Sequence, residues 1–301
     1  MDAFAPAEAS VIWLHLVALE LAAGALAFLT LVVKPRCQGA PQVWGRMICG
    51  SRRLAQISIA AAAATLFAWL WLAFRGILDS PSQIDPHFLA SFILKTQFGR
   101  SWLVRLFILL AASVPLLPGA ASRLYLGRSH LALCVLLLVS LAFSGHMAAG
   151  HGVGGALVHA AHLAATAAWV GSLPPLALLL HQAGTSGGVW AEVTGRVVRS
   201  YALYGTLAVL VLLGSGVTMV ATLGDGKFSW TDDYSRTLMA KLALFGAMGM
   251  LGLGNRFVLT KRVVRGDPQA IRTMRAMTVL EFAIALAVLF LAAALSQTSP
   301  P

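Results

Sequence analysis

Four histidines and one methionine gather in residues 146–162, and all of them carry donor atoms for soft metal ions. His159 and His162 are three residues apart, which places them on one face of a helix. The preceding segment SGHMAAGHGVGG adds His146, Met147 and His151. Neutral imidazole binds copper, zinc, iron and nickel, and a thioether favours Cu(I). These residue types therefore predict a transition-metal site that suits copper.

The first long apolar run, residues 11–33, adds a histidine and a carboxylate. His15 lies about one turn inside the N-terminal end of this run, and Glu20 lies near its middle. Ionisable residues within membrane helices are costly and mark functional sites. We therefore expect His15 to join the metal site and Glu20 to lie on the path of the ion or of a proton. An ion pair of Glu20 with Lys241 or Arg105 is the structural alternative.

The candidate ligands outnumber the three or four that a transition-metal ion usually binds. The full set is His15, His146, Met147, His151, His159 and His162. As a structural alternative, the same side chains only form interhelical hydrogen bonds or contact water. Haem is a second cofactor to consider, because histidines on facing helices can ligate its iron axially, and His15 would then pair with His159 or His162.

Two further groups of residues fall at special places in the apolar runs. Pro174 and Pro175 remove two backbone donors from the fifth run and predict a break, which in transporters exposes carbonyls along a path and elsewhere is a simple kink. Asn255, Arg256 and Glu281 lie at similar depth in the last two runs. An ion pair of Arg256 with Glu281 is the expected arrangement, and an inner gate for the ion is the alternative.

Composition requires that membrane helices position these residues. The chain has 301 residues, of which 58% are hydrophobic and 11% charged, and its mean hydropathy is +0.80. Soluble domains carry about 25% charged residues, so a soluble enzyme and a disordered regulator are excluded. The three cysteines, Cys37, Cys49 and Cys134, form no CxxC pair, and their odd number argues against a disulfide framework.

The apolar runs predict an all-α membrane bundle of about eight spans. A spanning helix needs about 20 apolar residues, and backbone groups in hydrocarbon must pair within the helix. The expected spans are 11–33, 54–74, 101–117, 130–145, 153–180, 201–223, 237–259 and 276–295. The fourth is the weakest because its apolar stretch is short. Residues 75–100 are expected to carry a short surface helix, and no internal sequence repeat is evident.

Basic residues define the orientation. Of the 22 Lys and Arg residues, 14 fall in the loops that join spans 1–2, 3–4, 5–6 and 7–8. By the positive-inside rule these loops are cytoplasmic and both termini are periplasmic. The net charge of +11 therefore indicates a bilayer and not nucleic acid as the partner. Six of the eight histidines then fall on the outer side, whereas Cys37 and Cys49 lie inside, where they could hand Cu(I) to a carrier.

Three segments resemble the copper resistance protein D (CopD) family. They are SGHMAAGHGVGGALVHAAHLAATAAWVGSLPPLALLL, TLMAKLALFGAMGMLGLGNRFVLTKR and AMTVLEFAIALAVLFLAAALSQTSPP. Lys241, Asn255, Arg256 and Glu281 are the more specific positions. The similarity is strongest in residues 144–301 and looser in 1–143, which we take as two halves of one transmembrane domain, 1–301. The resemblance implies a bacterial inner-membrane protein that moves copper from periplasm to cytoplasm, with a periplasmic CopC-type partner.

Residues and resemblance together predict an inner-membrane copper importer with a periplasm-facing His/Met site. The chain has no GxxxxGK[ST] motif, so transport driven by ATP is not expected. A haem-binding redox protein and a copper sensor or scaffold without transport are the alternatives. We do not expect an enzyme.

Overall fold

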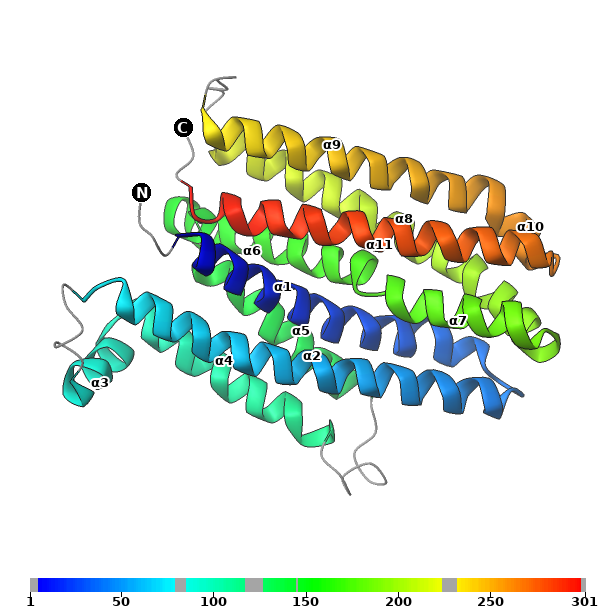
Figure 1. Cartoon of the computed structure of the whole chain (residues 1–301), viewed down its shortest axis with the longest axis horizontal. Helices are drawn as coiled ribbons and strands as arrows, with labels where there is room; N and C mark the ends of the chain where they lie inside the picture. Colours follow the sequence, from blue (N-terminus) through cyan, green and yellow to red (C-terminus); the bar gives the residue numbers. More distant parts are fainter. Residues whose placement is uncertain (1–4, 79–84, 117–126, 145, 224–231, 299–301) are drawn as a thin grey trace.

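The computed structural model describes residues 5–78, 85–116, 127–144, 146–223 and 232–298. Every regular element in these ranges is a helix, as predicted (Figure 1). The first half contains α1 (Ala5–Ala27), α2 (Pro41–Arg75), α3 (Pro86–Lys95), α4 (Gln97–Ser113) and α5 (Arg128–Val139). A π-helical turn, Phe28–Val33, extends α1, and a 3-10 turn, Ser140–Ser144, follows α5. The surface helix expected in residues 75–100 is α3.

The second half contains a broken helix and three further spans. Its elements are α6 (His146–Val170), α7 (Leu173–Ser186), α8 (Gly188–Leu223), α9 (Asp233–Gly254), a π-helical turn (Asn255–Leu259), α10 (Thr260–Val264) and α11 (Pro268–Leu295). The interruption between α6 and α7 confirms the break predicted from Pro174 and Pro175. Both prolines lie in the first turn of α7, where a missing N–H costs least.

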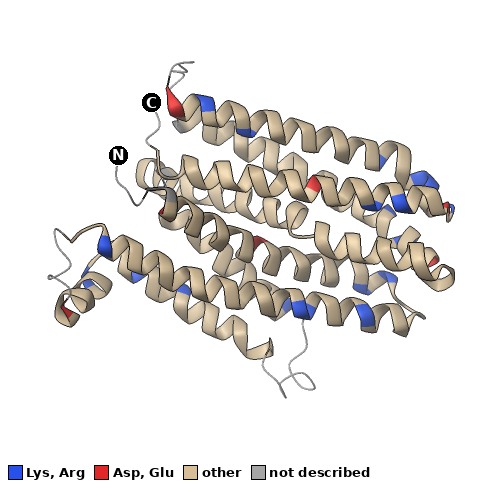
Figure 2. Cartoon of the chain, viewed as in Figure 1, with Lys and Arg blue, Asp and Glu red and all other residues tan. Residues whose placement is uncertain are grey.

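Seven of the eight expected spans are long and apolar enough to cross a membrane, and the fourth is the shorter apolar helix Arg128–Ser144. α2 and α8 begin earlier than the expected spans at 54 and 201 because polar N-terminal turns continue each helix beyond its apolar part. Apolarity marks the stretch in hydrocarbon and not the end of the helix. Figure 2 shows Lys and Arg concentrated at the end where α1 leads into α2, and Figure 1 shows that α1 begins and α11 ends at the other end.

The two halves repeat one packing arrangement. α1 packs on α2 as α6 packs on α8, and α4 packs on α5 as α9 packs on α11. α1 contacts α5 as α7 contacts α11, and across the halves α1 contacts α11 as α6 contacts α5. The chain therefore folds as two four-span halves in the same membrane orientation, although no sequence repeat was evident.

α1 and α6 cross at a pair of glycines with reciprocal contacts. A Cβ on Gly24 would lie 2.1 Å from the Ala167 carbonyl oxygen, and a Cβ on Gly171 would lie 2.1 Å from the Glu20 carbonyl oxygen. Gly24 follows His15 by nine residues, and Gly171 follows His162 by the same nine. Reciprocal contacts of this kind are those of a two-fold interface. Equivalent side chains of the two halves therefore face opposite sides of the α1–α6 pair.

The halves differ between their second and third spans. In the first half aromatic side chains seal α2 against α4: Trp102 donates its indole N–H to the Leu66 carbonyl at 2.9 Å, and the Phe67 and Trp102 ring centroids are 5.2 Å apart. In the second half α8 and α9 make few contacts with each other. This seam stays open and forms a cavity described below.

Candidate functional site

The N-terminal part of α6 faces α8 with polar side chains. His162 Nδ1 lies 3.0 Å from Ser215 Oγ, and His151 Nε2 lies 3.2 Å from the Thr222 carbonyl oxygen. Thr222 Oγ1 donates to Met147 Sδ at 3.5 Å. Ser215 and Thr222 are two helical turns apart and thus share one face of α8. Three of the predicted ligands therefore line one seam, which we call the α6–α8 seam.

His159 is a further candidate of this segment whose side chain the structure describes. His159 lies one turn from His162 on α6, and it is close enough to act on His162 electrostatically, as is Lys241 of α9. Gly152 adopts a positive φ of 56° that kinks α6 between His151 and the rest of the helix. The side chain of His146 lies outside the described residues.

His15 faces a different set of helices. Its Nδ1 lies 2.9 Å from Thr65 Oγ1 on α2, and its ring centroid is 6.0 Å from that of Trp69. The buried guanidinium of Arg105 on α4 acts on it electrostatically and stacks over Trp69 at 5.4 Å. Arg105 is itself held by Ser144 Oγ and by the Ser140 carbonyl oxygen. A permanent positive charge beside His15 disfavours a metal cation there.

These two groups occupy equivalent places in the two halves. His15, a threonine and Arg105 in the first half correspond to His162, a serine and Lys241 in the second. Because the halves are related by a two-fold arrangement, His15 and His162 point away from each other. This orientation fits neither a metal site that contains both residues nor a haem that both would ligate. Among the described residues, no group of three His, Cys, Asp or Glu side chains is placed to hold a metal ion.

Glu20 lies beside the break in the fifth span. It is fully buried, and neither carboxylate oxygen has a hydrogen-bond partner among the described residues, so the ion pair with Lys241 or Arg105 is not formed. Its carbonyl touches Gly171 at the end of α6. Because Pro174 and Pro175 have no N–H, the carbonyls of the preceding turn lose their helical donors there. A buried carboxylate and freed carbonyls thus lie near one level of the bundle.

The inner polar cluster differs from the expected ion pair. Glu281 is 3% exposed and accepts hydrogen bonds from Trp169 Nε1 at 2.7 Å and from Asn255 Nδ2 at 3.3 Å. Arg256 instead donates to the Ala202 carbonyl oxygen and to Thr206 Oγ1 on α8. The prediction of an Arg256–Glu281 pair was wrong, because the indole and the amide already occupy the carboxylate and α8 offers the guanidinium its acceptors.

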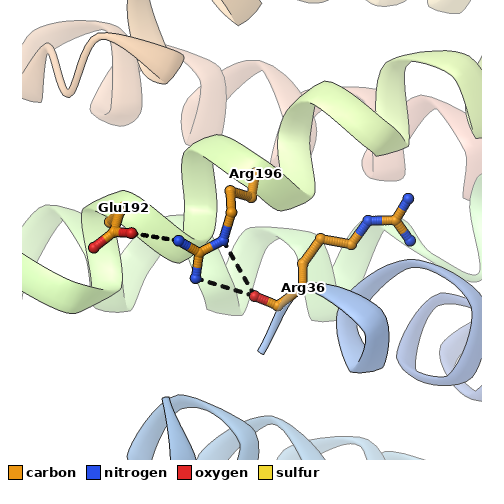
Figure 3. A network of polar contacts seen from close by, with 3 residues as sticks. All are labelled: Arg36, Glu192 and Arg196. Atoms are coloured by element: carbon orange, nitrogen blue, oxygen red, sulfur yellow. Dashed lines mark hydrogen bonds and ion pairs between the residues drawn. The ribbon is translucent and has the colours of Figure 1, made fainter. Parts of the chain in front are cut away.

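A network at the end of the bundle where α1 leads into α2 ties this connection to α8 (Figure 3). Arg196 pairs with Glu192 and donates through Nε and Nη2 to the Arg36 carbonyl oxygen at 3.3 and 3.2 Å. The adjacent Cys37 is buried, and burial raises the pKa of its thiol although the Arg196 charge lowers it. Cu(I) binds thiolates, so the buried thiol of Cys37 is poorly suited to hand over the ion.

The fold and the interior therefore define a polytopic all-helical membrane protein that carries histidine, carboxylate and guanidinium groups within its spans. Two sequence-family models match the chain: "Copper resistance protein D-like, N-terminal domain" over residues 7–156, and "Copper resistance protein D" over 195–295. The chain belongs to the copper resistance protein D family.

Two curated relatives agree with this assignment. "Copper resistance protein D" of Pseudomonas syringae pv. tomato is 31% identical over 222 residues, which cover 69% of this chain and 70% of the relative. "Inner membrane protein YebZ" of Escherichia coli (strain K12) is 28% identical over 211 residues, which cover 69% and 71%. No solved structure matches significantly. The chain is thus a multi-pass inner-membrane protein of a copper resistance family.

Proposed function

We propose that the protein carries copper across the inner membrane, inward from the periplasm, and that the α6–α8 seam receives the ion. The supporting observation is that Met147, His151 and His162 all contact one face of α8, spread over two turns of that helix at the outer side of the bundle. Imidazole nitrogen and thioether sulfur together suit copper. The kink at Gly152 separates the start of α6, which carries Met147 and His151, from the rest of the helix.

His15 is an unsuitable ligand in this scheme. Its hydrogen bond to Thr65 and the permanent charge of Arg105 belong to the twin position in the first half, where a cation is repelled. The equivalent group beside His162 is the amine of Lys241, which, unlike a guanidinium, can release its proton. The ligands are therefore drawn from Met147, His151, His159 and His162, with His146 as a further candidate from the predicted set.

Beyond the α6–α8 seam, Glu20 is the next residue that the ion would meet on its path. Its buried carboxyl group has no partner among the described residues and is held neutral until a cation displaces its proton, and the broken span beside it supplies carbonyl oxygens. Ligands at the outer side favour uptake over export. A periplasmic copper-binding protein of the CopC type would deliver the ion there.

The twin histidines provide a matched experiment. His162→Phe should abolish saturable Cu(I) uptake into vesicles that contain the pure protein, whereas His15→Phe should leave uptake within about twofold of the parent. Copper stoichiometry of the His159→Ala/His162→Ala double variant is measured alongside and should fall to zero. Equal loss in both single variants would refute the assignment to one seam. Absence of uptake by the parent itself would favour a sensor or scaffold, and a Soret band would favour haem.

A further inference from the structure

The open seam between α8 and α9 encloses a cavity of about 400 Å³. Pockets for small organic molecules are typically 300–1,000 Å³. Its walls are apolar and carry four aromatic rings, Trp169, Tyr201, Phe245 and Phe257, of which Trp169 and Phe245 pack edge to face at 5.8 Å. α8 and α9 have the least buried membrane segments of the described spans, so the seam faces the bilayer.

Hydrogen-bond acceptors are concentrated at the floor of this cavity. Each Glu281 oxygen accepts one hydrogen bond, from Trp169 or from Asn255, and retains the capacity for another. Asn255 Oδ1 is buried and has no partner among the described residues. A buried acceptor without a donor is costly, so the site suits a ligand that brings hydroxyl protons. The π-helical turn that begins at Asn255 is a type of distortion common at functional sites.

An anionic lipid head does not suit the same floor. Arg256 lines the cavity, but its guanidinium is bound to the Ala202 carbonyl oxygen and to Thr206 Oγ1 and bridges α9 to α8 at this end. A phosphate would then face the Glu281 carboxylate, which repels it. The occupant should therefore have an uncharged head.

The first half shows that this fold can close the seam. The equivalent space between α2 and α4 is filled by Trp102 against Phe67 and by Phe98 against Trp69. On α9 the corresponding wall carries glycines, and a Cβ on Gly246 or Gly249 would meet nothing within 4 Å. The second half thus leaves a space open beside the buried carboxylate of Glu281. Aromatic side chains fill the equivalent space in the first half.

We propose that this cavity binds a membrane-dissolved quinol, with its ring between the aromatic walls and its hydroxyl groups donating to Glu281 and Asn255. A quinol combines a planar ring, two hydroxyl donors, no charge and an apolar tail that can extend into the bilayer. The proposal concerns binding alone and stands independently of the copper transport proposed above.

The test uses the full-length protein in detergent and a short-tailed quinol, decylubiquinol, kept reduced. The rise of Tm with ligand concentration reports binding to the folded state. The parent should show a saturable rise, and Gly249→Leu should abolish it by filling the cavity. Gly254→Leu is the matched control, because it lies on the same helix with nothing within 4 Å of its Cβ but outside the cavity lining, and it should bind like the parent.

Two further comparisons isolate the head group. Glu281→Gln should weaken decylubiquinol binding about tenfold or more, and decylubiquinone, which lacks the hydroxyl protons, should bind at least tenfold more weakly than the quinol. Equal binding of both redox forms, or unchanged binding in Gly249→Leu, would overturn the proposal. Displacement of bound phospholipid alone, seen by native mass spectrometry without quinol binding, would overturn it as well, and so would competition by Cu(I) for the same site.

Discussion

The crossing of α1 and α6 can be tested by adding one methyl group. In Gly171→Ala the new Cβ would lie 2.1 Å from the Glu20 carbonyl oxygen, whereas such contacts are essentially never shorter than 3.0 Å. The partner is backbone, so the helices must separate by about 1 Å, which forfeits roughly half of the dispersion energy between facing atoms. Overpacking of this kind costs ~1–3 kcal/mol, and occasionally more.

Unfolding of the purified protein in mixed micelles measures this cost. Gly24→Ala meets the Ala167 carbonyl oxygen at the same 2.1 Å and should be destabilised by a similar amount if the halves are related as described. Gly214→Ala is the control, because its Cβ would meet nothing within 4 Å; it should be neutral or gain up to ~1 kcal/mol in helix propensity. Gly171→Ala with the stability of Gly214→Ala would contradict the close crossing.

The sequence alone was sufficient to predict the fold class, because the main signal of a membrane helix is the length of its apolar run. Long runs between basic loops need no tertiary information to be recognised as membrane helices. The weakest expected span is also the shortest one observed. The helix ends of α2 and α8 were not predictable in this way, because their first turns leave the apolar layer while remaining helical.

Side-chain direction was the information that the sequence lacked. His15 and His162 lie at similar depth in neighbouring helices, which suggested one site, yet rotation about each helix axis sends them to α2 and α8. The shared nine-residue spacing from each histidine to a crossing glycine was the available clue. Two identical spacings indicate a duplicated arrangement, in which equivalent residues away from the two-fold axis point in opposite directions instead of meeting.

The inner cluster shows the same limit for charges. Equal depth of Arg256 and Glu281 suggested a pair, but a buried carboxylate needs donors in good geometry and not only a nearby cation. The indole of Trp169, one helix away, fills that need at 2.7 Å. An indole N–H in an apolar run was a donor without an evident acceptor, and it was the signal that could have linked α6 to Glu281.

Two other consequences can be measured directly. Maleimide should label Cys49, which is exposed, well before Cys37, which is buried with a raised thiol pKa; equal rates in the folded protein would show that the contact of Arg196 with the Arg36 carbonyl does not keep Cys37 buried. Lys241→Leu should strengthen Cu(I) binding about tenfold, or ~1.4 kcal/mol, because it removes a like charge that acts on His162. Arg105→Leu removes the equivalent charge from the other half and should leave Cu(I) affinity unchanged, because the ion binds on the α6–α8 side. A competition assay with a Cu(I) chelator measures both affinities, and a gain in the Arg105 variant equal to that in the Lys241 variant would mean that both halves bind the ion.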